Sequence, residues 1–513
     1  MTIPNPILPG FHPDPSIVRV GKDYYIATST FEWFPGVRIY HSQDLASWQL
    51  VAEPLNRRSQ LDMRGIPDSC GVWAPCLSYD QGQFYLVYSN VKTFHGPWLD
   101  TPNYLVSSDD IAGDWSEPVF LNSAGFDGSL FHDDDGRKWY TSMLVDNRAS
   151  KLFGGILLQE YDPERQQLIG DPTIIFDGTD IGKTEGPHIY KKDGYYYLLT
   201  AEGGTEYGHA VSLARSKNIG GPYEISPNNP LLTSRNSAQH PLQKAGHGDL
   251  VSTEDGDWYL TYLTGRPLQE RGRCILGRET SIEMVKWQDG WLQTLSGKQE
   301  PEIRELPDKK SIRYDFKEGV SWDFQTLREP REESWLTIDK SKGVRLKGRC
   351  SLSSFFDQSL LARRVQNFQT EISLRMSFTP DNFQQMAGLC FYYNTQHYHY
   401  FHVRGHESGT RELVLITNDK QRITEEIVAT TDASAWTLRG KLDGSRLTFS
   451  FQDEVATWHE GPTVDSSILS DDYVLDGHIY HPAFTGMMVG FTCQDLTGSK
   501  RAAFFEWFDY KEF

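Results

Sequence analysis

Cysteine is scarce in this chain of 513 residues, and none of its cysteines forms a CxxC pair. A disulfide framework needs a much denser set of cysteines than this. We therefore expect free and mostly buried thiols rather than structural disulfides. The cysteines are Cys70, Cys76, Cys274, Cys350, Cys390 and Cys493.

Positive charge and long apolar runs are also in short supply. Lys and Arg number 50 against 69 Asp and Glu, so the formal net charge is −19, and the chain has no basic stripe with which to bind nucleic acid. No run approaches the roughly 18 apolar residues of a membrane span. The opening, MTIPNPILPGFHPDPSIV, has neither a basic start nor an apolar segment. We therefore expect a cytoplasmic protein without nucleic-acid or membrane partners.

Aromatic residues, in contrast, are abundant. They make up 13% of the chain, with 14 Trp, 25 Tyr and 27 Phe. Such a composition suits β-sheet cores and surfaces that stack on sugar rings. No amphipathic helix of ordinary length interrupts the first 300 residues, which argues against an α/β fold.

A short phrase recurs five times in the first 260 residues, and each copy leads into a Gly-containing turn and a Tyr- or Trp-rich strand. Such a period, with several strands per unit, is typical of a β-propeller. We predict a five-bladed propeller over residues 1–305. The copies are spaced by 60, 53, 58 and 62 residues and open at Asp14 (DPSIV), Ala74 (APCLS), Asp127 (DGSLF), Glu185 (EGPHI) and His247 (HGDLV).

The period ends near residue 300. The charged, Pro-containing stretch around residues 300–310 predicts a linker. From residue 312 to 513 the chain shows long strands of alternating pattern, such as HYHYFHVRG and GMMVGFTCQD, which is the pattern of a β-sandwich. The predicted fold class is therefore all-β, a propeller followed by a sandwich.

Three of the five repeat openings carry a carboxylic acid, namely Asp14, Asp127 and Glu185. Equivalent positions of a propeller surround one axis, so these acids are predicted to converge in the central funnel, at a cost in desolvation and repulsion that suits a reactive site. One protonated and one ionised carboxyl can hydrolyse a glycosidic bond. If roughly 6.5–9.5 Å separates them, a water fits between and the anomeric configuration inverts. The repeat does not decide which acid has which role.

Several segments closely resemble a known family. These are NPILPGFHPDPSIVRVGKDYYIATSTFEWFPGVRIYHSQDL, GVWAPCLSYD, TEGPH, LLTAEGGTEYGHA, LGRETSI and, near the end, QDLTG. They resemble the β-xylosidases and α-L-arabinofuranosidases of glycoside hydrolase family 43. The resemblance implies inverting exo-hydrolysis of terminal pentose, with xylose from short xylo-oligosaccharides first. It also implies a concanavalin-like sandwich that packs on the propeller and helps to close the pocket.

The same resemblance implies a role for each matched residue. Asp14 corresponds to the general base, Glu185 to the general acid, and Asp127 to the residue that tunes and orients the acid. Substrate contacts are implied at Phe31, Trp73, Arg278 and, from the sandwich, Phe484. His247 at the fifth axial position is expected at the site, where it could hold a water or a cation. No cofactor is required; a bound Ca²⁺ and homo-oligomer formation are left open.

The identity of the sugar is also left open. Val145, in SMLVDNR, stands where the resemblance leads us to expect a tryptophan of the pocket wall. A β-1,4-xylosidase is the first hypothesis, and an α-L-arabinofuranosidase or an enzyme with both activities is the second. A non-catalytic sugar-binding propeller is the alternative from another class. An endo-acting arabinanase would need an open groove.

Overall fold

The structure, a computed structural model, describes residues 3–95, 98–148, 151–452, 456–475 and 482–513. The chain divides into two compact units. Residues 1–272 and 278–307 belong to the first unit, and residues 273–277, 308–479 and 483–513 to the second. The helical elements bounded within the described residues are the 3-10 turn η2 (Ser466–Ile468) and α1 (Asp471–Leu475). Among the described helices, none has the length and apolar character needed to cross a membrane.

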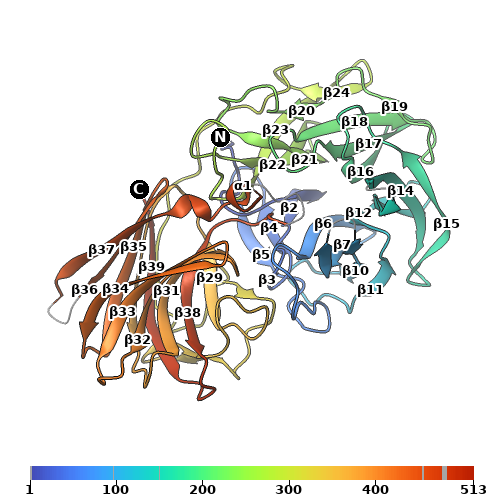
Figure 1. The fold of residues 1–513 in the computed structure, drawn as a ribbon. Helices are drawn as coiled ribbons and strands as arrows, with labels where there is room; N and C mark the ends of the chain where they lie inside the picture. Colours follow the sequence, from blue (N-terminus) through green and yellow to red (C-terminus); the bar gives the residue numbers. More distant parts are fainter. Residues whose placement is uncertain (1–2, 96–97, 149–150, 453–455, 476–481) are drawn as a thin grey trace. The chain divides into compact units, whose positions relative to one another are not determined.

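Five antiparallel sheets make up the first unit (Figure 1), as the repeat predicts. The first three sheets each contain four strands. Sheet one contains β1 (Ser16–Val20), β2 (Asp23–Thr28), β4 (Arg38–Ser42) and β5 (Gln49–Ala52); sheet two contains β6 (Gly71–Asp80), β7 (Gln83–Val91), β10 (Asn103–Ser108) and β11 (Val119–Asn122); sheet three contains β12 (Gly125–His132), β13 (Lys138–Asp146), β14 (Leu152–Asp162) and β15 (Gln167–Phe176).

The last two sheets repeat the same order of strands. Sheet four adds a short fifth strand that pairs with β18. It contains β16 (Glu185–Lys192), β17 (Tyr195–Glu202), β18 (Ala210–Ser216), β19 (Glu224–Ile225) and β20 (Leu232–Thr233); sheet five contains β21 (Gln243–Ser252), β22 (Trp258–Gly265), β23 (Arg278–Gln288) and β24 (Trp291–Thr294). Short strands outside these sheets are β3 (Trp33–Phe34), β8 (Thr93–His95) and β9 (Trp98–Asp100).

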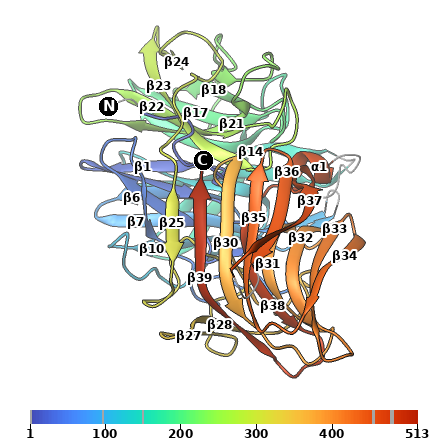
Figure 2. The same ribbon diagram turned by 90° about the vertical axis from the view of Figure 1, so that its left-hand side faces the viewer.

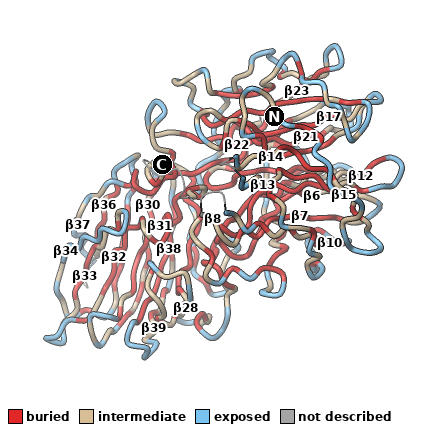
Figure 3. Tube along the Cα trace, turned by 45° about the vertical axis from the view of Figure 1, so that its right-hand side comes forward, coloured by how far each residue is buried: buried red, intermediate tan, exposed pale blue. Residues whose placement is uncertain are grey.

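The five sheets surround one axis. Their innermost strands contact one another in the cyclic order β1, β6, β12, β16, β21 and back to β1, and all five strands begin with buried residues. Figure 3 colours the buried residues of the tube red, including those near the labels of β6 and β21. Apolar side chains fill the space between neighbouring sheets; Ile17, Ile26 and Ile282 share one such cluster. The N-terminal segment completes the ring, since Leu8 bridges to Thr280 of β23.

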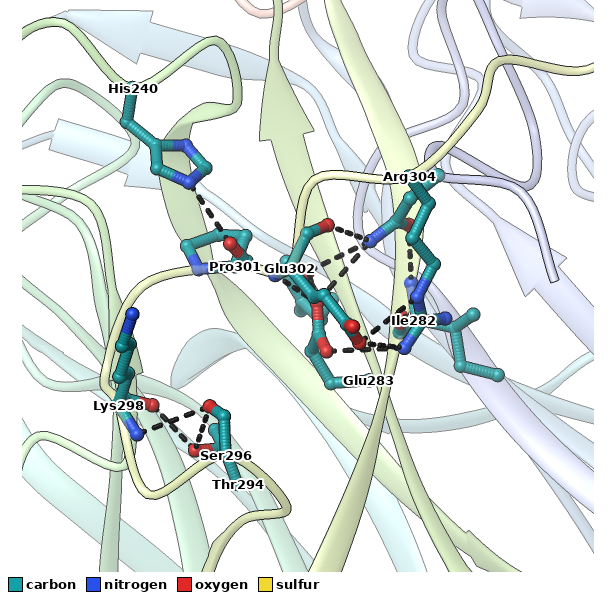
Figure 4. A network of polar contacts seen from close by, with 11 residues as sticks. His240, Ile282, Glu283, Thr294, Ser296, Lys298, Pro301, Glu302 and Arg304 are labelled. Atoms are coloured by element: carbon teal, nitrogen blue, oxygen red, sulfur yellow. Dashed lines mark hydrogen bonds and ion pairs between the residues drawn. The ribbon is translucent and has the colours of Figure 1, made fainter. Parts of the chain in front are cut away.

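The segment that follows sheet five is held on the propeller by a buried carboxylate. Glu283 of β23 accepts from the Glu302 N–H at 2.6 Å and from Arg304 Nη2 at 3.4 Å. His240 Nε2 lies 2.9 Å from the Pro301 carbonyl (Figure 4). The boundary between the two compact units falls within the predicted linker, after Pro307, and these contacts hold the first residues of the linker on the propeller.

The second unit contains two large antiparallel sheets, whose long strands run side by side in Figure 2. Alternating apolar side chains, as in β30, place one face of each strand in the core. The first sheet contains β25 (Ser311–Tyr314), β27 (Leu336–Asp339), β28 (Gly343–Lys347), β30 (Gln369–Ser377), β35 (Ala435–Asp443), β36 (Arg446–Gln452), β37 (Trp458–Asp465) and β39 (Ala502–Glu512). The second contains β29 (Leu360–Arg364), β31 (Gln385–Asn394), β32 (His397–Gly405), β33 (Arg411–Asp419), β34 (Arg422–Thr431) and β38 (Met488–Asp495). The short strand β26 (Thr326–Leu327) lies between β25 and β27 in the chain.

Candidate active site

Each innermost segment has a residue with a left-handed backbone near its start; β6 and β21 have a further one at their first or second residue, Gly71 and Lys244. Irregular pairing interrupts β6, β12, β16 and β21 next to the first-mentioned residue. Such φ values are uncommon outside glycine, and strained residues and bulges concentrate at functional sites. They identify the structurally equivalent positions of the five sheets. The residues at these positions are Asp14, Ala74, Asp127, Gly186 and His247, with φ of 55°, 26°, 57°, 56° and 48°.

The repeat predicted from the sequence is therefore out of register by one residue in sheet four. Gly186, and not Glu185, is the equivalent of Asp127. Glu185 occupies the position before the bulge, as Phe126 does in sheet three. A shift of one residue along a strand changes the direction in which the side chain points. Glu185 therefore reaches the site from a different direction than Asp127 does. Only Asp14 and Asp127 are acids at the shared position.

A second ring of polar side chains supports the corrected register. In sheets one, four and five it lies two residues further along the innermost strand, where Asp249 contacts the other two side chains. Asp249 Oδ2 accepts from Ser16 Oγ at 2.9 Å, and its Oδ1 lies 3.7 Å from His188 Nδ1. Ser16, His188 and Asp249 each come two residues after the left-handed residue of their own sheet, which is Asp14, Gly186 and His247 respectively. The same spacing in three sheets agrees with Gly186, and not Glu185, as the equivalent residue.

Asp14 is held as a carboxylate. Arg278 Nη1 donates to Oδ1 at 2.7 Å, and Ser29 Oγ donates to Oδ2 at 2.6 Å. Burial on its own raises the pKa of Asp14, but the Arg278 charge, followed by the interaction with His247 and the Ser29 hydrogen bond, outweighs it and leaves the pKa below its ordinary value. An ionised carboxylate of this kind can accept a proton from water, which is what a general base does.

Asp127 and Glu185 have the opposite electrostatics. Both are buried, and burial is the main cause that raises the pKa of each carboxyl above its ordinary value. Negative charge adds to it: Glu185 and Asp14 raise the pKa of Asp127, and Asp14 raises that of Glu185. The Asp127–Glu185 pair therefore retains at least one proton at a pH where Asp14 is ionised.

Hydrogen bonding indicates which of the two holds the proton. Asp127 Oδ2 accepts from the Gly186 N–H at 3.1 Å, which stabilises a charge on Asp127. Glu185 Oε1 is buried and, among the described residues, has no hydrogen-bond partner. The geometry therefore favours the proton on Glu185, which leaves this carboxyl ready to donate it.

Aromatic rings form a cluster beside these acids. Trp73 lies next to Phe31, Phe94 and Phe126, with ring centroids 6.2, 6.0 and 5.3 Å away. The Trp73 indole N–H donates to the Ser69 carbonyl at 2.9 Å, which fixes the ring. The cluster provides the apolar surface on which a sugar ring can stack.

Phe31 and Arg278, two of the predicted substrate contacts, lie together. The Arg278 guanidinium is 5.6 Å from the centroid of the Phe31 ring, and both side chains are buried. The structure therefore brings Phe31, Trp73 and Arg278 into the neighbourhood of Asp14. Their contact with substrate stays a prediction.

His247 also lies at the axis, with Nδ1 3.7 Å from Asp14 Oδ1. Burial lowers the pKa of His247 to about 4, so the ring is neutral at neutral pH and can exchange hydrogen bonds with water or a hydroxyl. A cation at this place would face the Arg278 charge already bound to Asp14. The surroundings of His247 therefore do not favour a metal ion.

Two further residues were singled out from the sequence, Phe484 and Val145. Phe484 is half-buried and belongs to the second unit, and its contact with substrate stays a prediction. Val145 is half-buried at the end of β13, two residues beyond Met143, which pairs with Phe126. Val145 therefore lies at the same end of sheet three as Asp127.

Two residues of the site are absent from the sequence prediction. Ser29, which donates to Asp14, also accepts from the Ala74 N–H at 2.8 Å, so it links the first two sheets. Lys183 is exposed, and its charge lowers the pKa of Glu185 against the larger effect of burial. Serine and lysine are common in loops, so neither carries a motif; for Lys183, its place two residues before Glu185 is the signal that could have revealed it.

A funnel with one ionised carboxylate, one carboxyl that keeps its proton and an aromatic wall has the groups of a glycoside hydrolase. A search against family models supports this class. The chain belongs to family 43 of the glycosyl hydrolases, whose model matches residues 3–292. The model of the beta xylosidase C-terminal concanavalin A-like domain matches residues 313–511. The predicted family, the all-β fold class and the assignment as an enzyme are therefore confirmed.

Individual relatives are similar over the whole chain. "Xylosidase/arabinosidase 43B" of Humicola insolens is 47% identical, with 99% of this chain and 97% of that protein covered. "Beta-xylosidase" of Bacillus subtilis (strain 168) is 46% identical, with 100% of both chains covered. The crystal structure of xylan beta-1,4-xylosidase from Bacillus halodurans C-125 shares 48% identity and a TM-score of 0.95, with 100% of both chains covered.

The electrostatics of the acids predict a broad pH profile. Activity needs Asp14 ionised and one proton on the Asp127–Glu185 pair. Since the pKa of Asp14 is lowered, activity is lost on the acid side only at a pH below the ordinary pKa of an Asp carboxyl. Since the pKa values of Asp127 and Glu185 are raised, activity is lost on the alkaline side only at a pH well above the ordinary pKa of a Glu carboxyl. Rate measurements against pH check both limbs.

Removing the Lys183 charge should move only the alkaline limb. Lys183→Met raises the pKa of Glu185, so this limb shifts to higher pH, by less than about one unit because the lysine is exposed. Lys192→Met, at the other end of β16, removes the same charge away from Glu185 and serves as the control. An alkaline limb that moves equally in both variants would contradict the assignment of this limb to Glu185.

Proposed function

We propose that this protein is an inverting exo-glycosidase, a β-1,4-xylosidase that releases xylose from the non-reducing ends of short xylo-oligosaccharides. The observation that carries the proposal is the opposite shift of carboxyl pKa values within one funnel, lowered at Asp14 and raised at Asp127 and Glu185. The names of the relatives support the sugar, since all three mention xylosidase activity.

In the proposed reaction, Asp14 removes a proton from a water molecule as the water oxygen attacks the anomeric carbon of xylose. The bond from this carbon to the glycosidic oxygen breaks, and its electron pair stays on the oxygen. Glu185 donates its proton to that oxygen, so the alcohol leaves neutral. Asp14 then holds the proton and Glu185 is ionised, and proton exchange with solvent restores both.

Asp127 has a supporting role in this proposal. Its carboxylate accepts from the Gly186 N–H, and its negative charge near Glu185 makes ionisation of Glu185 less favourable. Asp127 thereby keeps the proton on the acid until the glycosidic oxygen takes it. Arg278 and His247 border the base and are proposed to bind hydroxyl groups of the terminal sugar.

The second candidate is an α-L-arabinofuranosidase, or an enzyme with both activities. One relative is named xylosidase/arabinosidase, and Val145 has a small side chain where the resemblance leads us to expect tryptophan. Both sugars are pentoses and can present similar hydroxyl groups to one pocket. A smaller wall residue leaves more room for the furanose ring.

Paired aryl glycosides test the sugar. We expect a higher kcat/KM on aryl β-xyloside than on aryl α-L-arabinofuranoside, and Val145→Trp should widen the ratio because it narrows the wall. Val145→Ile, which keeps the aliphatic character, is the control. A preference of the wild type for the furanoside would overturn the xylosidase proposal, and NMR of the first-formed sugar with retained configuration would overturn inversion.

The proposal includes no cofactor. A pair of carboxyl groups is sufficient for the hydrolysis of a glycosidic bond in most glycoside hydrolases. We derive no step through Ca²⁺, since Arg278 already supplies positive charge beside Asp14. A cytoplasmic location is also proposed; the six cysteines, all unpaired, are compatible with a reducing compartment.

A further inference from the structure

A second buried carboxylate, Glu202, lies behind the strand that carries Glu185. Glu202 is the last residue of β17 and is fully buried. Its Oε1 accepts from the Thr179 N–H at 2.7 Å and from Thr184 Oγ1 at 2.8 Å. Its Oε2 accepts from Ser212 Oγ at 2.7 Å and from Thr179 Oγ1. All four neighbours donate, and a carboxylate is the side chain that can accept from all of them.

Three of these four donors come from the loop that leads into β16. The loop folds tightly over Glu202: a Cβ at Gly178 would lie 1.9 Å from Thr184 Oγ1 and 3.1 Å from Glu202 Oε1. The Gly203 N–H, directly after Glu202, donates to the Gly182 carbonyl at 2.8 Å. Glu202 and its neighbour therefore hold the loop at both of its ends.

The loop ends at Thr184, which is the residue before Glu185. Glu185 itself pairs with Ala201, the residue before Glu202. Its Oε1 has no hydrogen-bond partner within the part of the chain that the structure describes. With this oxygen unrestrained, the position of the carboxyl depends on the backbone at Thr184 and Glu185, and hence on what holds that backbone.

We propose that Glu202 is the positioning residue of the general acid. It acts through Thr184 and does not touch the substrate. The proposal rests on the role proposed for Glu185. A donor carboxyl has to lie within hydrogen-bond reach of the glycosidic oxygen, and displacements near 1 Å reduce rates strongly. Loss of the Glu202 carboxylate should therefore impair proton donation more than any other part of the reaction.

The test compares two substrates with different need for a proton. Glu202→Gln replaces one acceptor oxygen by an NH₂ group, which cannot accept the hydrogen bonds that this oxygen received. We expect kcat on xylobiose to fall about 10- to 100-fold. On 2,4-dinitrophenyl β-xyloside, whose leaving group departs as a stable anion, kcat should change less than about threefold, since no proton is required. KM should change little for both substrates.

A matched pair of variants separates positioning from stability. Thr184→Val removes the hydroxyl that reaches Glu202 and should show the same dependence on the leaving group, whereas Thr184→Ser keeps the hydroxyl and should restore activity on xylobiose. Ser212→Ala, which removes the donor outside the loop, is the control. These variants also test the proposal if Glu202→Gln does not fold.

Two results decide the outcome. Equal losses on both substrates in Glu202→Gln and Thr184→Val would overturn the positioning role, because a structural defect affects both reactions alike. Glu185→Gln is measured alongside. If Glu185→Gln shows no dependence on the leaving group, the proposed function fails; if it does and the Glu202 and Thr184 variants do not, the positioning role alone fails.

Discussion

Glu185→Gln is expected to lower kcat on xylobiose by about 10²- to 10⁴-fold, the usual contribution of a general acid. The amide has nearly the same shape as the carboxyl but no acidic proton, so the alcohol would have to leave as an alkoxide. The effect should be much smaller on 2,4-dinitrophenyl β-xyloside, and the alkaline limb of the pH profile should disappear for this substrate. Steady-state kinetics on both substrates measure the result.

The matched control for Glu185→Gln is Asp133→Asn. Asp133 is a buried carboxylate, which binds Lys191 Nζ at 2.5 Å and the Tyr196 hydroxyl at 2.7 Å. Its replacement costs a buried charge without touching the acids, so kcat should stay that of the wild type on both substrates. Full activity of Glu185→Gln on xylobiose would exclude Glu185 as the acid. Binding of sugar without turnover by the wild type would restore the non-catalytic sugar-binding hypothesis.

Asp14→Ala is expected to reduce kcat by about 10²- to 10⁴-fold on both substrates, because every productive attack needs the activated water. The two acids thereby differ in a measurable way: the leaving group matters for Glu185 and does not matter for Asp14. Asp14→Asn, which keeps the shape of the side chain and one of the two acceptor oxygens used by Arg278 and Ser29, should be equally inactive. Similar inactivity of the two variants assigns the effect to the missing base rather than to a gap in the packing.

Azide gives the control for Asp14→Ala. This anion is already a nucleophile and can attack the anomeric carbon from the space that the carboxylate leaves, without needing a base. The glycosidic bond breaks, Glu185 protonates the alcohol, and the product is a xylosyl azide of inverted configuration, identified by NMR. Glu185→Gln should not respond to azide on xylobiose. A retained configuration in the Asp14→Ala product would contradict the direct displacement.

The propeller could be predicted from the sequence because each innermost strand repeats a short pattern with an aromatic strand behind it. The family resemblance then assigned roles to Asp14, Asp127 and Glu185, which the repeat could not do. The register of sheet four was wrong, since the pattern was aligned on its acid. The Pro-Ile pattern shared by the first and fourth copies is better satisfied with Gly186 at the first position, as the left-handed backbone at Gly186 shows.

Other parts of the site could not be predicted. Ser29 and Glu202 are ordinary residue types in strands and loops, and nothing in their local pattern separates them from a surface residue. Their importance comes from neighbours that are distant in the chain or in another sheet, such as Asp14 for Ser29. The residues after sheet five illustrate the same limit, because Glu283 binds them from β23.

The all-β architecture and the family could be predicted from the sequence, because strand alternation, turn residues and motif residues are local properties that a single chain records directly; the same motif residues predict the three acids of the site. Tertiary structure alone decided how these acids differ. The Arg278 charge ionises Asp14, burial keeps a proton on the Asp127–Glu185 pair, and the Gly186 N–H favours the proton on Glu185. The pKa of a carboxyl depends on its solvation and on charges brought near by folding, and neither is recorded in the order of the residues.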